Sequence, residues 1–485
     1  MIFYALICAS LLAITVGYCA MFKRRFEECV GLGVLTDIII MFIAGYLGHL
    51  NLGAIAVAVI SAISLIAGIC ICLSRGEFRE LATSYFSLAF FIFLGGMVLV
   101  YFTCKDLTLT GSDAATSLIK LIASNESIEK VATADFAKIG WAPGYALFCY
   151  MFTALSGSLT DGYVIGGATI FVLAFILPVI NRMKWKAIVP GIFSAAVMLL
   201  IPWVISTECL NTVNADLACG LVFGFMLIAV LDREYSGYGF VSLGLGSCAL
   251  FLMRPGAELL AAVALLVVVV DVIACGWKKM VPMFTSARWF SIVIYAVLTG
   301  AGFLGWWVYA ADHGITRLYD CLYITEARAA NLAGNVTTVA QYLAKGQIGG
   351  ISYDWWIVIL AVLGCAAALL QKDFWDRIHT GVRAMAVIVG FAVFTFGLAL
   401  AFTYIFPVDY DYTGMLQGYL SAYILGMLLF MVTTVLNSIM DRFRTYWRLL
   451  VIAVLVLMLL IAPYNEAFKV MFAGVKDIIE LVKIH

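Results

Sequence analysis

The sequence predicts an all-α protein that crosses a membrane about fourteen times. Of its 485 residues, 64% are hydrophobic and only 12% are charged, whereas soluble domains have roughly 45–50% apolar and about 25% charged residues. Many uncharged segments are long enough to cross a hydrocarbon core of roughly 30 Å as a helix, and a helix satisfies its own backbone polar groups there. These segments do not alternate apolar with polar residues, as the strands of a membrane barrel would.

The predicted spans begin at the N-terminus and continue almost to the end of the chain. They are residues 2–22, 30–48, 52–73, 84–103, 161–180, 187–205, 214–231, 237–253, 257–276, 289–311, 354–371, 383–405, 416–438 and 447–464. The first apolar stretch lacks a preceding basic segment, so we expect it to be a span rather than a cleaved signal.

The cations of the short loops predict the orientation. Eighteen Lys and Arg residues lie in seven alternate loops, whereas the loops at 49–51, 206–213 and 406–415 contain none. Because Lys and Arg accumulate in cytoplasmic loops, the pattern places the N-terminus outside and the cation-free loops on the outer face of a cell membrane.

This orientation leaves room for only one crossing between residues 104 and 186, although two apolar pieces lie there. We expect residues 161–180 to cross. The shorter piece, 143–158, opens on Pro143-Gly144 and is predicted to be a helix in the outer interface that roofs a site.

Two long polar loops are predicted on the outer face, at 104–160 and 312–353. In the first, Ala115, Leu118, Ile119 and Ile122 form an apolar stripe at helical spacing, which predicts a juxtamembrane helix. The second contains a predicted short helix near 324–333. The C-terminal stripe from Phe468 to Val482 predicts an amphipathic helix on the membrane surface.

Arg254 is an exception among the cations, because it lies in a tight outer turn, Leu252-Met253-Arg254-Pro255-Gly256. A lone guanidinium at the headgroup level is well suited to bind a phosphate. The alternatives are a snorkelling side chain or an i,i+4 pair with Glu258.

Carboxylates lie at the same predicted level. Asp113 follows a turn and begins a helix, and Asp216 opens the span at 214–231. Taken singly, each is typical of a helix cap or first-turn acid. Together with Arg254 they predict a site in which a carboxylate deprotonates an acceptor hydroxyl and the arginine stabilises a departing phosphate. Asp411 adds a third acidic position, to which we assign a substrate contact.

Other chemistries have no support in the sequence. The four histidines have no metal-ligand spacing, and no P-loop or nucleophile elbow is present. No metal and no cofactor is predicted, with a divalent-cation requirement left open, and the net charge of zero gives no sign of nucleic-acid binding. Asp37 and Asp271 lie within spans near their inner ends, where each has cations nearby. Cys104, Cys209 and Cys321 are predicted to be buried thiols, with a disulfide among them as the alternative.

The order of these features resembles the C-type glycosyltransferase superfamily, which includes the bacterial protein O-mannosyltransferases and lipid A aminoarabinose transferases. The matching stretches are Gly111-Ser112-Asp113-Ala114, Trp141-Ala142-Pro143-Gly144-Tyr145, Asn214-Ala215-Asp216-Leu217, Met253-Arg254-Pro255 and Gln417-Gly418-Tyr419. The chain departs from the family pattern at three positions. Ala114 replaces a second acid, Ala142 replaces the first residue of a double proline, and Gly418 replaces an arginine.

The resemblance implies transfer of a sugar from a polyprenyl-phosphate donor to a cell-envelope glycan, lipid or protein acceptor on the outer face. Asp113 is then the general base and Asp216 a supporting acid. Arg254 and Lys120 bind the lipid phosphate, and Tyr145 and Tyr419 contact substrate.

In domain terms, the resemblance makes residues 84–440 the transferase-like core. Residues 1–83 are then additional N-terminal helices, and 441–485 hold the last span and the amphipathic helix. Two alternatives remain: a transporter or flippase of lipid-linked saccharides, which would carry charges near the bilayer midplane, and a catalytically degenerate member of the same fold.

Overall fold

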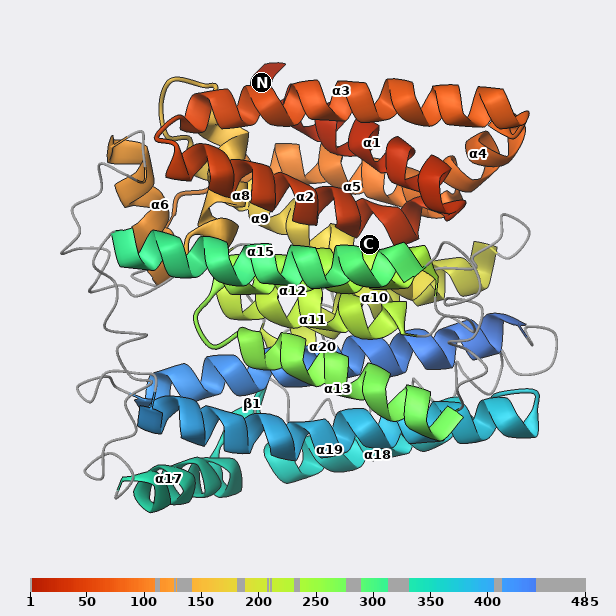
Figure 1. The fold of residues 1–485 in the computed structure, drawn as a ribbon, viewed down its shortest axis with the longest axis vertical. Coiled ribbons are helices and arrows are strands. Elements are labelled where there is room, and N and C mark those ends of the chain that lie inside the picture. Colours follow the sequence, from red (N-terminus) through yellow and green to blue (C-terminus); the bar gives the residue numbers. More distant parts are fainter. Residues whose placement is uncertain are drawn as a thin grey trace, which may run out of the picture.

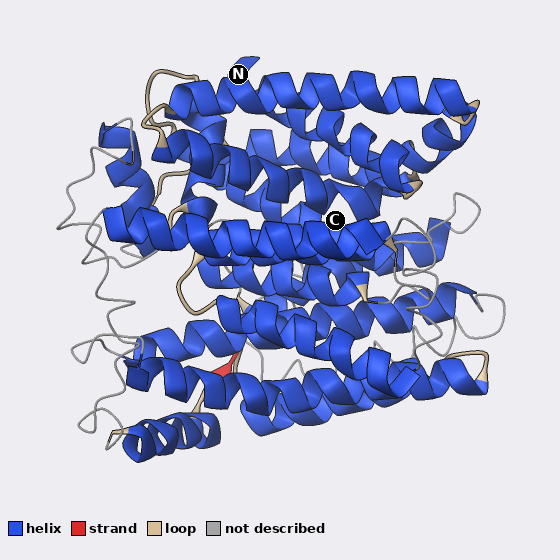
Figure 2. Ribbon diagram, viewed as in Figure 1, coloured by secondary structure: helices blue, strands red, loops and turns tan. Residues whose placement is uncertain are grey.

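The computed structural model is an all-α bundle, as predicted (Figures 1 and 2). It describes residues 2–109, 114–125, 128, 142–180, 188–206, 209, 212–230, 236–275, 289–312, 331–404 and 412–441. Within these ranges there are seventeen α-helices, one 3₁₀ turn and one two-stranded antiparallel hairpin.

The first half of the bundle comprises α1 (Ile2–Phe22), α2 (Phe26–Tyr46), α3 (Leu50–Arg75), α4 (Phe78–Tyr85), α5 (Leu88–Cys104), α6 (Ala114–Asn125), α8 (Gly144–Ala154), α9 (Asp161–Ile176), η1 (Leu177–Ile180) and α10 (Ile188–Ile205). The second half comprises α11 (Ala215–Ala229), α12 (Gly237–Met253), α13 (Glu258–Cys275), α15 (Phe290–Asp312), α17 (Leu332–Lys345), β1 (Gln347–Ile348), β2 (Ile351–Ser352), α18 (Tyr353–Leu369), α19 (Phe374–Tyr404) and α20 (Tyr412–Asp441).

Seven of the described helices are long and apolar enough to cross a membrane, or eight if the bent pair α4 and α5 is one span. The chain is therefore a polytopic helical membrane protein. Other predicted spans correspond to shorter helices. Among them, α11, α12 and α18 are apolar helices of fewer than eighteen residues. The last predicted span, 447–464, and the amphipathic C-terminal helix lie outside the described residues, so the structure does not reach the predicted number of fourteen.

Two contacts join helix ends that were predicted to share a face. At one end, the Tyr46 hydroxyl donates a hydrogen bond to Asp312 (2.7 Å), joining the ends of α2 and α15. At the opposite end, Lys23 contacts Glu77 (2.5 Å) between the α1–α2 and α3–α4 turns. We call the first the Tyr46 end; it is the end predicted to face outward.

Small residues let the central helices approach closely. On α11, Gly220 lies against the backbone of Ala422, and Gly224 lies against Gly426 and Leu429 of α20. This four-residue glycine spacing is typical of close helix pairs in membranes, where packing rather than hydrophobicity drives association. The pair α11 and α20 forms the centre of the bundle and brings the first turn of α11 beside the second turn of α20.

Helix α8 corrects one expectation. Residues 143–158 were predicted to lie in the interface, but every residue of α8 is buried, whereas an interfacial helix has a polar face. A Cβ atom at Gly144 would lie next to Leu252 at the end of α12 and to Ile38 in the middle of α2, while Phe152 contacts Gly167, the seventh residue of α9. Eleven residues span only about 16 Å. Helix α8 is therefore enclosed by neighbouring helices inside the bundle.

Candidate functional site

The central feature of the Tyr46 end is an ion pair between Asp216 and Arg254. Asn214 caps α11 by accepting a hydrogen bond from Leu217 N (3.0 Å), which places Asp216 in the first helical turn. Arg254 follows the last residue of α12 in extended conformation. The two residues were predicted to lie at the same level, and in the structure they are in direct contact. This contact joins α11 to the turn 254–257, which we call the Arg254 turn.

The two partners differ in exposure. The Arg254 side chain is 2% exposed, whereas that of Asp216 is 21% exposed. A guanidinium buried to this degree requires charge compensation, which the carboxylate supplies. Asp216 is the more exposed partner, so solvent reaches part of its side chain but not the guanidinium.

Tyr419 supports the guanidinium from α20. The Arg254 guanidinium carbon lies 3.8 Å from the centre of the Tyr419 ring, a short cation–π distance. The Tyr419 hydroxyl donates a hydrogen bond to the carbonyl oxygen of Pro255. Gly256 has φ +86° and lies against the same ring, so a larger residue there would be both strained and crowded. The ring fixes the Arg254 turn independently of Asp216.

Gly418 makes room for the carboxylate. A Cβ atom at this position would overlap the Asp216 carboxylate. The sequence marked Gly418 as a departure, because an arginine is expected there. In the structure, the absence of a side chain at 418 allows Asp216 to lie between α20 and Arg254. This role was not predicted, since nothing in the local sequence joins residues 216 and 418.

The site is set back from the Tyr46 end. Phe251 of α12 packs on Phe303 of the parallel helix α15 (5.8 Å between ring centres), and α15 continues to Asp312. On α20, six residues precede Gly418. At 1.5 Å per residue, these neighbours extend roughly 6–9 Å beyond the Arg254 turn. Figure 1 shows the loop from α12 to α13 inside the limits of α15 and α19. The Arg254 turn is therefore recessed by this distance from the ends of its neighbouring helices.

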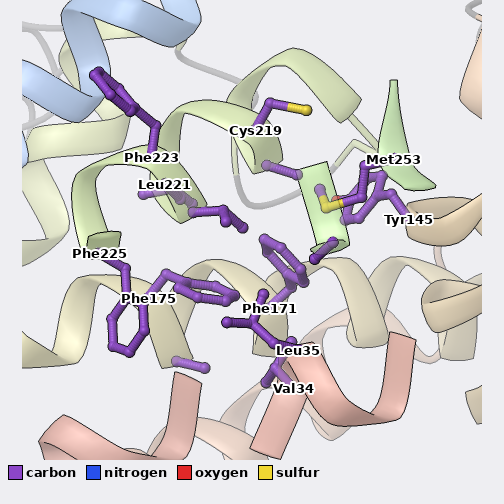
Figure 3. Packing of buried hydrophobic residues seen from close by; sticks show 14 of the residues in the cluster. Val34, Leu35, Tyr145, Phe171, Phe175, Cys219, Leu221, Phe223, Phe225 and Met253 are labelled. Atoms are coloured by element: carbon purple, nitrogen blue, oxygen red, sulfur yellow. The ribbon is translucent and has the colours of Figure 1, made fainter. Parts of the chain in front are cut away.

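Tyr145 belongs to the packed core below the site. Its ring meets Phe171 edge-on at 5.1 Å, and Figure 3 shows it among side chains of α2, α9, α11 and α12. Tyr145 is 1% exposed. It was predicted to contact substrate; in the described structure its neighbours are core aromatic residues, so it positions the start of α8.

Of the remaining predicted site residues, Lys120 contacts a loop carbonyl and not this pair. The apolar stripe of α6 is buried as predicted, and Lys120 lies on the opposite, exposed face. Its Nζ donates to the Leu109 carbonyl (3.3 Å), and α6 packs against α8. Asp113 and Asp411 lie outside the described residues.

Two further carboxylates are buried inside spans. Asp271 forms a bidentate pair with Arg383 of α19, at 2.8 and 3.0 Å, which bears out a cationic partner for Asp271. Arg383 was predicted to begin the span 383–405 and was one of the eighteen loop cations, but α19 begins nine residues earlier, at Phe374, and buries it. Asp37 lies in the middle of α2 rather than near its inner end, and among the described residues neither of its oxygens has a hydrogen-bond partner.

No group of three potential metal ligands occurs in the described parts of the chain. Cys104 and Cys209 are free, buried thiols there, and Cys321 lies outside the described residues. Burial raises the pKa of Cys209 to about 12, so this thiol stays protonated and unreactive at neutral pH.

Comparisons of the chain with protein-family models, with curated proteins and with solved structures found no significant match.

Proposed function

We propose that the chain is a membrane glycosyltransferase that takes a sugar from a polyprenyl-phosphate donor and transfers it to a cell-envelope acceptor on the outer face. The observation that carries the proposal is the recessed pair of Asp216 and Arg254 beneath the Tyr46 end. A phosphate linked to a long lipid chain needs a cation near the membrane surface, and a guanidinium binds phosphate oxygens with directed hydrogen bonds.

The depth of Arg254 supports a lipid-linked ligand. A soluble phosphate would be met by exposed cations at the surface, whereas the Arg254 turn lies roughly 6–9 Å below the ends of its neighbours. At this depth the polarity is lower than in water, so an ionic contact with phosphate is stronger.

In the proposed reaction, an acceptor hydroxyl oxygen attacks the anomeric carbon of the sugar. The bond between this carbon and the phosphate oxygen breaks, and the electron pair leaves with the polyprenyl phosphate. The hydroxyl proton passes to a carboxylate, for which Asp113 is the candidate. Arg254 stabilises the charge that develops on the phosphate. No redox partner is required.

The proposal is tested by sugar release from a panel of polyprenyl-phosphate-linked donors with the purified chain in nanodiscs. Wild type is expected to turn over at least one donor, Asp113→Asn to lose turnover while still binding the lipid, and Arg254→Met to lose both. Lys105→Met, at an exposed cation of the same end, is the matched control. Turnover that survives in Arg254→Met would contradict the proposal.

A second candidate is a transporter or flippase of lipid-linked saccharides. It is favoured by the short, fully enclosed helix α8 and by Asp37, which is fully buried at mid-span. Broken helices and intramembrane carboxylates are frequent in transporters. Movement of a fluorescent polyprenyl-phosphate saccharide between the leaflets of proteoliposomes, lost in Asp37→Asn and without sugar release, would favour this candidate over the transferase.

A further inference from the structure

The Asp216–Arg254 pair has one fixed member and one member with access to solvent. The guanidinium carbon of Arg254 lies 3.8 Å from the centre of the Tyr419 ring, and the Pro255 carbonyl accepts a hydrogen bond from the hydroxyl of the same tyrosine. None of these contacts involves Asp216. Removing the carboxylate from the guanidinium therefore leaves the Arg254 turn anchored to α20.

The carboxylate has a favourable alternative position. Asp216 lies in the first turn of α11, next to the Asn214 cap, where the backbone N–H groups and the helix dipole stabilise a negative charge. Its side chain is 21% exposed, so it can turn toward solvent without being buried as an unpaired charge. The carboxylate can thus leave Arg254 when another anion compensates the buried guanidinium, whereas Arg254 cannot follow it.

The contact between Asp216 and Arg254 also depends on the space that Gly418 leaves free. The Asp216 carboxylate occupies the volume that a side chain at position 418 would fill. The pair is therefore set by three elements, the first turn of α11, the second turn of α20 and the Arg254 turn, and the addition of one methyl group at Gly418 is enough to displace the carboxylate.

We infer that Asp216 is a displaceable counter-ion, which occupies Arg254 in the ligand-free protein and is replaced there by the phosphate of a prenyl-phosphate lipid. This inference rests on the proposed function and adds a regulatory step to it. Both anions compete for one guanidinium, so Asp216 lowers the affinity for the lipid phosphate and returns to Arg254 when the product leaves. A phosphate monoester, with a second pKa near 6 and thus close to two negative charges at neutral pH, displaces the carboxylate better than a diester with one charge.

The test measures binding of a short-chain prenyl phosphate monoester to the purified full chain in nanodiscs of uncharged lipid. The prenol of the same chain length separates lipid-chain contacts from phosphate contacts, and inorganic phosphate separates a free anion from a lipid-linked one. Asp216→Asn keeps the shape of the side chain but removes its charge. Asp161→Asn is the matched control, because Asp161 is also a first-turn acid at the same end and accepts a hydrogen bond from Leu109 N (3.0 Å).

Asp216→Asn is expected to bind the prenyl phosphate about tenfold more tightly than wild type, with Asp161→Asn and prenol binding unchanged. Gly418→Ala is the second variant, since it displaces the carboxylate without removing its charge, and it is expected to bind several-fold more tightly too. Equal or weaker binding in both variants would overturn the inference.

The outcomes also separate this inference from the proposed function. Tighter binding in Asp216→Asn without sugar transfer from any donor supports the displaceable counter-ion and contradicts the transferase. Sugar transfer with no tighter binding in either variant supports the transferase and overturns the counter-ion. Absence of phosphate binding in every variant overturns both.

Discussion

The guanidinium of Arg254 and the carboxylate of Asp216 form an ion pair between residues 38 positions apart in the chain, and they differ tenfold in exposure, at 2% and 21%. The buried member is the cation, and the ring of Tyr419 lies beneath it. This arrangement makes the stability of the Tyr46 end depend on which partner is removed.

Asp216→Leu is expected to destabilise the protein by about 3–5 kcal/mol, because it removes the carboxylate that compensates a buried charge. Arg254→Met is expected to be milder, since the partly exposed Asp216 can be hydrated. The double variant should be more stable than the sum of the two single effects implies. Thermal unfolding in detergent measures all three, and strict additivity would show that the two side chains do not interact.

Added prenyl phosphate is expected to restore stability to Asp216→Leu. The phosphate supplies the negative charge that the variant lacks, so the melting temperature should rise more in the variant than in wild type at the same lipid concentration. Arg254→Met provides the control and should show no rise. An equal rise in all three proteins would place lipid binding elsewhere.

Gly418→Ala is expected to lower the melting temperature, although alanine in a helix is normally favoured over glycine by roughly 0.5–1 kcal/mol. The added methyl group overlaps the Asp216 carboxylate. Gly300→Ala is the matched control, because a Cβ atom there has no neighbour within 4 Å, and it should be neutral or stabilising. The same response in both variants would contradict the close contact at Gly418.

The buried pair of Asp271 and Arg383 predicts a different asymmetry. Either single replacement by leucine should destabilise the protein by about 3–5 kcal/mol, because it leaves the remaining charge buried. The double replacement should recover most of this loss, since apolar residues of similar volume often substitute well for a buried pair. Thermal unfolding of the two single variants and the double variant checks this, and a double variant as unstable as the worse single variant would argue for a further partner.

The predicted sidedness can be checked with single cysteines at the two ends of α3, in a background without the exposed native thiols. Asn51 and Ser74 are both exposed. Because the cation pattern places the Tyr46 end outside, Asn51→Cys should react with an impermeant thiol reagent added to intact cells, and Ser74→Cys only after permeabilisation. The reverse pattern would invert the orientation.

Much of this architecture was predictable because hydrophobicity and loop charge act locally. The helical membrane fold is confirmed, and Asp216 and Arg254 were expected at one level from loop parity alone. Their contact was not predictable, since it depends on Gly418 of α20, some 160 residues beyond Arg254. The depth of the Arg254 turn was missed for a related reason: it follows from the parallel packing of α12 on α15, and no local pattern encodes how two helices are offset.

For helix α8, the sequence pattern was compatible with two different positions. Its sequence is too short to cross and too apolar to be a loop, so its length suggested an interfacial position. Only the contacts of Gly144 with α2 and α12, and of Phe152 with Gly167, show that it lies inside the bundle. An apolar segment of this length fits either place, and the tertiary packing decides.

The most direct test of the proposed phosphate site is equilibrium binding of a polyprenyl phosphate to wild type and Arg254→Met in nanodiscs, with the corresponding polyprenol as reference. Wild type is expected to prefer the phosphate over the alcohol by at least tenfold, with the preference falling as salt increases, and Arg254→Met to bind the two alike. Equal preference for the phosphate in wild type and in a folded Arg254→Met variant would contradict the assignment of Arg254 as the lipid-phosphate ligand.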